Sequence, residues 1–270
     1  MSSLRIGTYN ILMPRTDHLT KGVASWIERK ESVIDTIDQE FDFVGLQEVE
    51  FNEPHLQGEQ LTEELENRGW VGYIPSRDKL FKDRFHERLP IFWRPEVFKL
   101  HRAGQILLSS WLPHELSQVP ILENRYGSFV KGTLSSGQKL TFYTLHFQHQ
   151  TSGAQLLESQ VTQLKRAEAQ RSLVTHLLNN QEKDELVIIA GDFNSSEPLL
   201  EFAAAGIREV NSVVENLERW DHDSFHDWKD PKNGNHFDRV FISKEVSGGS
   251  ARIGDSLASD HYPVVYKLNC

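Results

Sequence analysis

The sequence predicts an α/β protein whose β-sheets are covered by helices on their outer sides. Strand-like segments outnumber helical ones, and the helical segments fall between strands. With 270 residues, of which 38% are hydrophobic and 25% charged, the chain can bury a large core. No repeat and no Pro/Gly/Ser-rich linker divides it. We therefore expect one domain over residues 1–270.

Two segments have the periodicity of amphipathic helices. The first covers residues 21–41, and its apolar positions recur every three to four residues: Val23, Trp26, Ile27, Val33, Ile34 and Ile37. The second covers residues 154–179, and its expected buried stripe is Leu157, Val161, Leu164, Ala167, Val174 and Leu178. Each stripe predicts a helix that packs against a sheet.

Short apolar or alternating segments predict the strands. They cover residues 4–12, 43–49, 91–93, 97–101, 129–134, 139–147, 186–193, 238–242 and 262–268. The Ser-Ser-Gly sequence at residues 135–137 predicts a hairpin turn between two of them.

Several strands carry an apolar series that ends in a polar residue on the same face, because side chains alternate with period two. The series are Leu4, Ile6, Thr8 and Asn10; Val44, Leu46 and Glu48; Leu140, Phe142, Thr144 and His146; and Leu186, Ile188, Ala190, Asp192 and Asn194. Burying such polar ends without partners is costly. We therefore expect them to meet in one shared cleft.

Composition limits the classes of function and the cellular setting. The formal net charge is −10, which opposes broad nucleic-acid binding and is compatible with a divalent cation held by oxygen ligands. Cys270 is the only cysteine, so no intrachain disulfide or cysteine-based zinc site can form. We expect no secretory signal, no membrane span and a cytoplasmic location.

Six short motifs carry the candidate chemistry. In chain order they are Thr-Tyr-Asn-Ile at residues 8–11, Leu-Gln-Glu-Val at 46–49, Thr-Leu-His at 144–146, Gly-Asp-Phe-Asn at 191–194, His-Phe-Asp-Arg-Val-Phe at 236–241 and Ser-Asp-His at 259–261. The ordered set resembles the endonuclease/exonuclease/phosphatase superfamily over nearly the whole chain. The resemblance implies a four-layered α/β sandwich, with two mixed sheets face to face, helices outside and the site at one end.

The resemblance also implies a phosphoesterase that depends on Mg²⁺, for which Mn²⁺ can substitute. Glu48 matches the principal metal ligand, with Asn10 and Asp260 nearby. Asp192 matches the residue that positions or deprotonates the attacking water, and Asn194 matches the neighbour that holds the phosphate.

Two histidines complete the implied site. Asp238 and His261 match a carboxylate–imidazole pair, and His146 matches a second histidine that stabilises the transition state or protonates the leaving oxygen. These residue types also suit phosphoester hydrolysis on chemical grounds. The reaction requires that the phosphate charge be neutralised and that a water be oriented for attack. An aspartate on one imidazole nitrogen also fixes the tautomer.

Other residues are candidates for substrate contact. Arg88, Arg166 and Gln170 are expected near the cleft. A basic cluster of Arg77, Lys79, Lys82, Arg84 and Arg88 fits either an exposed face or a rim that contacts phosphate. Residues 221–227 are acidic and rich in histidine, and we expect a solvated loop there rather than a metal site.

The resulting hypothesis is metal-assisted in-line attack of water on a phosphodiester or phosphomonoester. The expected substrate is a short single-stranded nucleic acid or a small phosphorylated molecule, because the net charge disfavours long duplexes. Two alternatives stay open: a catalytically silent binding module on the same fold, and a duplex DNA endonuclease.

Overall fold

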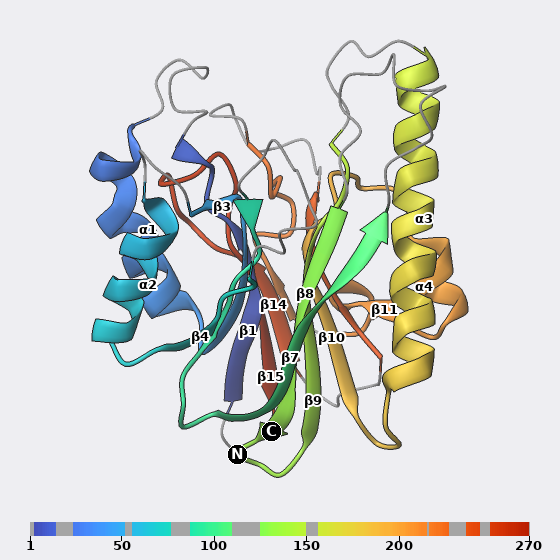
Figure 1. Ribbon diagram of the computed structural model, residues 1–270, viewed down its shortest axis with the longest axis horizontal. Helices are drawn as coiled ribbons and strands as arrows, with labels where there is room; N and C mark the ends of the chain where they lie inside the picture. Colours follow the sequence, from blue (N-terminus) through green and yellow to red (C-terminus); the bar gives the residue numbers. More distant parts are fainter. Residues whose placement is uncertain are drawn as a thin grey trace.

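The computed structural model describes residues 3–14, 24–51, 56–76, 87–109, 125–149, 156–214, 216–226, 236–243 and 249–269. Within these ranges two mixed sheets face each other, and helices cover both outer sides (Figure 1). The predicted α/β class and its layered arrangement are therefore confirmed. No helix in the described ranges is long and apolar enough to cross a membrane.

The first sheet has seven strands in the order β12-β14-β15-β1-β2-β6-β4. Their bounds are Asn216–Glu218, Gly249–Ile253, Val264–Asn269, Ser3–Asn10, Phe43–Gln47, Ile91–Trp93 and Val71–Tyr73. Strands β1 and β2 run parallel, with Asn10 opposite Gln47. Their carboxyl ends therefore lie at the same edge of the sheet.

The second sheet has six strands in the order β11-β13-β10-β9-β8-β7. Their bounds are Arg208–Glu209, Asp238–Ile242, Leu186–Asp192, Lys139–His146, Arg125–Leu134 and Phe98–Ser109. The turn at residues 135–137 joins β8 to β9 as predicted, and Gly137 has a φ of 88°, which favours glycine. A separate ribbon pairs β3, Val49–Glu50, with β5, Glu87–Arg88.

Three hydrophobic layers hold the sandwich together. The layer between the sheets includes Ile6, Phe142 and Ile188, all fully buried. Helices α1, Trp26–Glu40, and α2, Gln57–Asn67, cover the first sheet. Helices α3, Leu156–Asn180, and α4, Leu200–Ala204, cover the second, and a short 3-10 helix η3 spans Val210–Ser212 (Figure 1).

Helix α1 begins at a capping box. The Glu28 carboxylate accepts hydrogen bonds from the backbone N–H and hydroxyl of Ser25, at 2.7 and 2.8 Å. The predicted stripe includes Ile27, yet this side chain is 81% exposed, whereas Val33, Ile34 and Ile37 are buried. Ile27 immediately follows the buried Trp26, and consecutive residues of a helix point in different directions, so Ile27 lies outside the buried face.

The predicted stripe of α3 is wrong at two positions. Val161 is buried as predicted, but Leu164 and Leu178 are 65% and 71% exposed, and the helix buries Ala169, Leu173 and Leu177 instead. Apolar residues occur on several sides of this helix, so spacing alone did not identify the buried face.

A polar layer separates the core from one end of the sandwich. The Thr8 hydroxyl donates to Gln47 Oε1 at 2.8 Å, and Gln47 Nε2 donates to the Thr144 hydroxyl at 2.7 Å, which joins the two sheets. The sheets approach closely here, because a Cβ on Gly45 would lie 2.5 Å from Thr144 Cβ. Strand-end side chains beyond this layer are therefore held at fixed positions.

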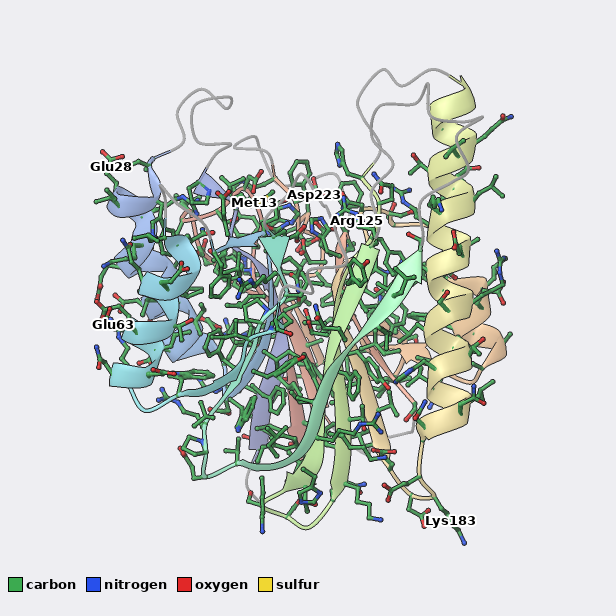
Figure 2. The ribbon with its side chains drawn as sticks, in the orientation of Figure 1. Met13, Glu28, Glu63, Arg125, Lys183 and Asp223 are labelled. Atoms are coloured by element: carbon green, nitrogen blue, oxygen red, sulfur yellow. The ribbon has the colours of Figure 1, made fainter. Side chains whose placement is uncertain are left out.

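Loops of the two sheets meet at the same end. Met13 and Asp223 lie there beside Arg125, whereas Lys183 lies at the opposite end (Figure 2). The carboxyl ends of β1, β2, β9 and β10 converge at the first of these ends, since β1 pairs with β2 and β9 with β10 in parallel.

Candidate active site

Asp192 occupies the centre of the converging strand ends. It lies opposite His146 on β9 and opposite Asp238 on β13 in the sheet register. The series from Leu186 to Asp192 runs along the interior of the sandwich as predicted, with Ile188 and Ala190 buried between the sheets. Its predicted last member, Asn194, lies beyond the end of β10 in a left-handed conformation, so the strand alternation does not extend to it. The sheet therefore sets the spacing of three functional groups directly.

Glu48 reaches the same place by a different route. Val44 and Leu46 face the helices rather than the other sheet, so they do not share a face with Glu48 as predicted. Glu48 lies between β2 and β3 with a φ of 60°, a left-handed conformation that few non-glycine residues adopt. This turn directs its carboxylate into the cleft.

The Glu48 carboxylate is held by the loop after β1. Asn10 Nδ2 donates to Glu48 Oε1 at 3.3 Å, and the Met13 backbone N–H donates to Glu48 Oε2 at 3.1 Å. Burial raises the pKa of Glu48, and the Asp260 and Glu87 carboxylates raise it further, whereas His146 lowers it.

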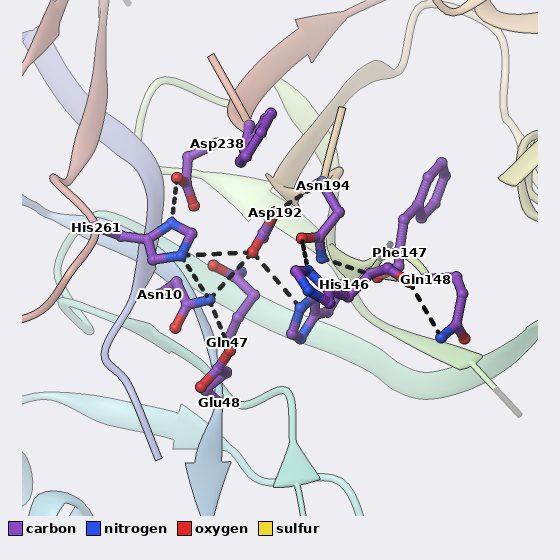
Figure 3. Close-up of polar contacts among 12 residues, drawn as sticks. Asn10, Gln47, Glu48, His146, Phe147, Gln148, Asp192, Asn194, Asp238 and His261 are labelled. Atoms are coloured by element: carbon purple, nitrogen blue, oxygen red, sulfur yellow. Dashed lines mark hydrogen bonds and ion pairs between the residues drawn. The ribbon is translucent and has the colours of Figure 1, made fainter. Parts of the chain in front are cut away.

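Asn10 links the two halves of the site. Its Nδ2 lies 3.1 Å from Asp192 Oδ2 and 3.4 Å from His261 Nε2, besides its contact with Glu48 (Figure 3). Its Oδ1 accepts the Leu12 backbone N–H at 3.1 Å, which fixes the rotamer. A substitution here removes contacts with both sheets at once.

Asp238 and His261 form a buried pair. Asp238 Oδ2 lies 2.6 Å from His261 Nδ1, as Figure 3 shows. The Ser224 hydroxyl accepts the Asp238 backbone N–H at 2.8 Å, which anchors the carboxylate's position. Burial raises the pKa of Asp238 to about 6. Burial alone lowers the pKa of His261, but the carboxylates of Asp238 and Asp192 raise it well above 6.5.

Glu87 and His146 form a second pair, which sequence reasoning missed. Glu87 Oε1 lies 2.5 Å from His146 Nδ1 and accepts the Glu48 backbone N–H at 3.0 Å. Arg125 Nη1 lies 3.4 Å from Glu87 Oε2. Burial raises the pKa of Glu87, but His146 and Arg125 outweigh it and lower the value to about 2. Burial lowers the pKa of His146, whereas Glu87 raises it, with a net increase.

Both imidazoles approach the same carboxylate oxygen. Asp192 Oδ2 lies 3.5 Å from His146 Nε2 and 3.9 Å from His261 Nε2. Burial raises the pKa of Asp192, but the two histidines outweigh it, and the net pKa is lowered. An ionised aspartate between two imidazoles can hold a water and accept its proton.

Asn194 lies on the side of Asp192 that faces α3. It has a φ of 51°, which asparagine tolerates, and its backbone N–H donates to Asp192 Oδ1 at 2.7 Å. Its Nδ2 donates to the Phe147 carbonyl at 3.1 Å. His149 Nδ1 lies 3.1 Å from Asn194 Oδ1, so this loop residue contacts the site.

Different surroundings are found for the remaining predicted site residues, which are Arg166, Gln170, Arg88 and Asp260. The Arg166 guanidinium donates to the carbonyls of Gln148 and Asn194, at 3.0 and 2.5 Å, and Gln170 is buried on the same helix. The Arg88 guanidinium lies over the Phe51 ring, 4.5 Å from its centroid. Asp260 is half-buried beside His261 and contributes to the electrostatics of Glu48.

Arg77, Lys79, Lys82 and Arg84 lie outside the described residues. The expectation of a solvated loop is wrong for its central part, since Asp223, Ser224 and His226 are buried. His226 Nε2 lies 3.0 Å from the Ser259 carbonyl, and its ring stacks on Tyr262 at 4.3 Å. This segment packs behind Asp238 and His261 and orders them.

The donor set fits a divalent cation. Glu48 and Asp260 offer the carboxylate oxygens that Mg²⁺ prefers, and Asn10 holds the Glu48 carboxylate through its Nδ2. Burial raises the pKa of Glu48, the Asp260 and Glu87 carboxylates raise it further, and a bound cation would favour the ionised form. Ligand atoms of Asp192, Asp238 and His261 also lie within 4.8 Å of one another.

Arg29 ties together the loops that carry this donor set. Its buried guanidinium donates to the carbonyls of Ile11, Leu12 and Ala258. Replacing Arg29 with Met leaves these carbonyls without that donor, so we expect a loss of about 1–3 kcal/mol in unfolding free energy. Urea denaturation measures it. Arg171→Met is the control: this exposed side chain is expected to contribute less than about 0.5 kcal/mol, and equal losses in both variants contradict the prediction.

The Glu87–His146 pair predicts a pH dependence of stability in the metal-free protein. The lowered pKa of Glu87 stabilises the fold above pH 4.5, and this contribution is lost as pH falls toward 2. The raised pKa of His146 stabilises the fold below pH 6.5, and that contribution is lost as pH rises through its folded value. We expect the difference in Tm between wild type and Glu87→Gln, in chelator, to be largest between pH 4.5 and 6.5. A difference independent of pH refutes this assignment.

Comparison with known proteins places this geometry in a family. The model of the Endonuclease/Exonuclease/phosphatase family matches residues 7–261. A search of curated proteins found no match. An endonuclease/exonuclease/phosphatase from Bacteroides vulgatus has a TM-score of 0.75 at 18% identity, with 100% of this chain and 99% of that chain covered.

Two further solved structures share the fold. A mannosyl-6-phosphatase from Bacteroides thetaiotaomicron has a TM-score of 0.71 at 17% identity, covering 99% of this chain and 100% of that chain. The human Nocturnin catalytic domain, solved with a bound sulfate, has a TM-score of 0.67 at 18% identity, covering 99% and 94%. At these identities the likeness concerns the fold.

Proposed function

Because the chain belongs to the endonuclease/exonuclease/phosphatase family, we propose that it is a Mg²⁺-dependent phosphoric ester hydrolase. The observation that carries the proposal is the convergence of two carboxylate–imidazole pairs on Asp192, beside the Glu48 and Asn10 side chains. Few structural roles need two carboxylate–imidazole pairs buried around a third carboxylate.

The reaction is attack of water on phosphorus, with cleavage of the phosphorus–oxygen bond to the leaving alcohol. Asp192 orients the water and accepts its proton, because its lowered pKa keeps the carboxylate ionised and its Oδ2 lies between the His146 and His261 rings. Asn194 holds a phosphate oxygen through its side chain. His261, oriented by Asp238, stabilises charge on the phosphoryl group.

His146, oriented by Glu87, supplies the proton to the leaving oxygen, since its pKa is raised and its Nδ1 is occupied by the carboxylate. Glu48, Asn10 and Asp260 would hold the cation. When bound, Mg²⁺ would neutralise charge on the phosphate oxygens.

The proposed substrates are small phosphorylated molecules or short single strands. The net charge of −10 disfavours a long duplex, because duplex affinity depends on phosphate neutralisation by many basic residues. A mannosyl-6-phosphatase among the structural neighbours supports the small-molecule choice. Mn²⁺ is expected to substitute for Mg²⁺, and we place the enzyme in the cytoplasm.

A panel of substrates tests the proposal. Sugar phosphates, inositol phosphates, nucleotides, single-stranded RNA and DNA, and duplex DNA are incubated with the protein in Mg²⁺, Mn²⁺ or excess chelator. We expect hydrolysis of at least one small or single-stranded substrate that chelator abolishes. Undiminished activity in chelator refutes metal dependence, and no hydrolysis of any substrate favours a silent binding module.

Glu48→Gln is expected to lower affinity for Mn²⁺ at least tenfold, because it removes a charged ligand. The fold is expected to persist, since Glu48 lies in the turn between β2 and β3 and is absent from the hydrophobic layers. Direct binding of Mn²⁺, followed by its paramagnetic resonance signal, measures this without an assay of activity. Glu59→Gln, on the exposed face of α2, is the control, and equal affinities in both variants contradict the assignment.

A further inference from the structure

A pocket of about 740 Å³ lies beside Asn194, between α3 and the segment that follows β10. Of its lining residues, the proposed chemistry uses only Asn194. Its described walls come from the loop after β9, one face of α3, residues 194–200 and Phe237. Pockets of 300–1,000 Å³ bury most of a drug-sized ligand, so this volume exceeds the needs of a phosphate group.

The pocket shares a wall with the site. Asn194 lines it, and the backbone N–H of the same residue donates to Asp192 Oδ1 at 2.7 Å. His149 also lines it and contacts Asn194 Oδ1 at 3.1 Å. A phosphoester held at Asp192 therefore has its organic part within reach of the pocket.

The walls are fixed before any ligand binds. Arg166 joins the two loops that line the pocket, through the carbonyls of Gln148 and Asn194. The Phe147 and Phe193 rings pack edge to face at 4.9 Å and are fully buried, so they support the pocket wall from behind. Preformed walls of this kind reduce the entropy lost on binding.

The charged side chains that line the pocket disfavour some classes of ligand. Arg166 is the only guanidinium among the described residues that line the pocket, and two of its nitrogens already donate to carbonyls, while Glu197 adds a negative charge. A second phosphate is therefore disfavoured. Gln163, Gln170 and Ser195 line the pocket together with the apolar Ala167, Pro198 and Leu199, a mixture that suits an uncharged ring with several hydrogen-bonding groups.

We propose that this pocket binds the uncharged cyclic part of the substrate, a monosaccharide or a nucleoside, while the phosphate lies at Asp192. The position of the phosphate rests on the proposed function. The pocket itself is a binding site whether or not the protein is an enzyme. Sugar and nucleoside rings share the required chemistry, and the experiment separates them.

Ligand-observed NMR tests the pocket with free, uncharged probes and no metal. The probes are glucose, mannose, galactose, adenosine, guanosine, cytidine and uridine. We expect weak, saturable binding of one of the two groups to the wild type. Ala167→Trp, which fills the pocket, is expected to weaken that binding at least tenfold, whereas Leu178→Trp on the exposed side of the same helix leaves it unchanged.

Gln170→Leu provides a second variant that keeps the volume, in case the tryptophan prevents folding. We expect it to weaken binding about fivefold through the loss of one hydrogen-bonding side chain. Absence of binding by every probe, or equal binding by wild type and both pocket variants, overturns the inference. Binding that depends on Ala167 in a protein without hydrolytic activity supports the pocket and refutes only the proposed function.

Discussion

Replacing Asp192 with asparagine is expected to lower kcat about 10³-fold on whichever substrate the panel identifies. The carboxylate is the group that both imidazoles face, and an amide of the same size cannot accept the proton of the attacking water. Steady-state kinetics at saturating Mg²⁺ measures the change. Asp255→Asn, at a carboxylate that is 73% exposed, is the control and is expected to leave kcat unchanged.

The same variant has a readout that needs no substrate. Asp192 raises the pKa of both His146 and His261, so its removal is expected to lower both values. NMR titration of the imidazole signals in chelator measures this shift. Unchanged histidine pKa values together with full activity would show that Asp192 does not lie at the reacting centre.

The architecture could be predicted because apolar residues recur at every second position along the interior strands, and this pattern shows which side chains face the core. Leu4 and Ile6 on β1, and Ile188 and Ala190 on β10, face the core, and the next residues on that face end in the cleft. As long as the strand stays regular, its period of two predicts which way the last side chain of the strand points. The same rule correctly located Asn10, Asp192 and His146.

The rule fails where the backbone departs from a regular strand. Glu48 enters the cleft through a left-handed turn, so the face of Val44 and Leu46 gave no information about it. Glu87 lies on a two-residue strand, too short for any periodic pattern. Its partnership with His146 depends on contacts between residues far apart in the sequence, and only the folded arrangement reveals it.

The buried segment around Ser224 illustrates a different limit. Its composition is polar, and polar loops are generally exposed. Here the polar groups find partners: Ser224 accepts the Asp238 backbone N–H, and His226 contacts the Ser259 carbonyl. Composition cannot distinguish a solvated polar loop from one whose hydrogen bonds are satisfied internally.

The two carboxylate–imidazole pairs predict a pattern of coupling between mutations. Within the first pair, Asp238→Asn and His261→Gln are each expected to lower kcat about 10²–10⁴-fold. The double variant is expected to be little worse than the poorer single one, because the carboxylate acts through the imidazole that it orients at 2.6 Å. The same relation is expected for Glu87→Gln and His146→Gln, whose contact is 2.5 Å.

Between the pairs, the expected relation is different. If His261 stabilises charge on the phosphoryl group and His146 protonates the leaving oxygen, each acts on a different atom of the same transition state. The fold-losses in kcat of His261→Gln and His146→Gln should then multiply in the double variant, down to the activity that remains without either imidazole.

A substrate with an acidic leaving alcohol separates the two roles further, since such an alcohol leaves without being protonated. His146→Gln should be nearly silent on a p-nitrophenyl ester, whereas His261→Gln should remain slow. Equal losses on both kinds of substrate, or loss of Tm in proportion to activity, would instead make the second pair a structural support for Glu48, whose backbone N–H Glu87 accepts.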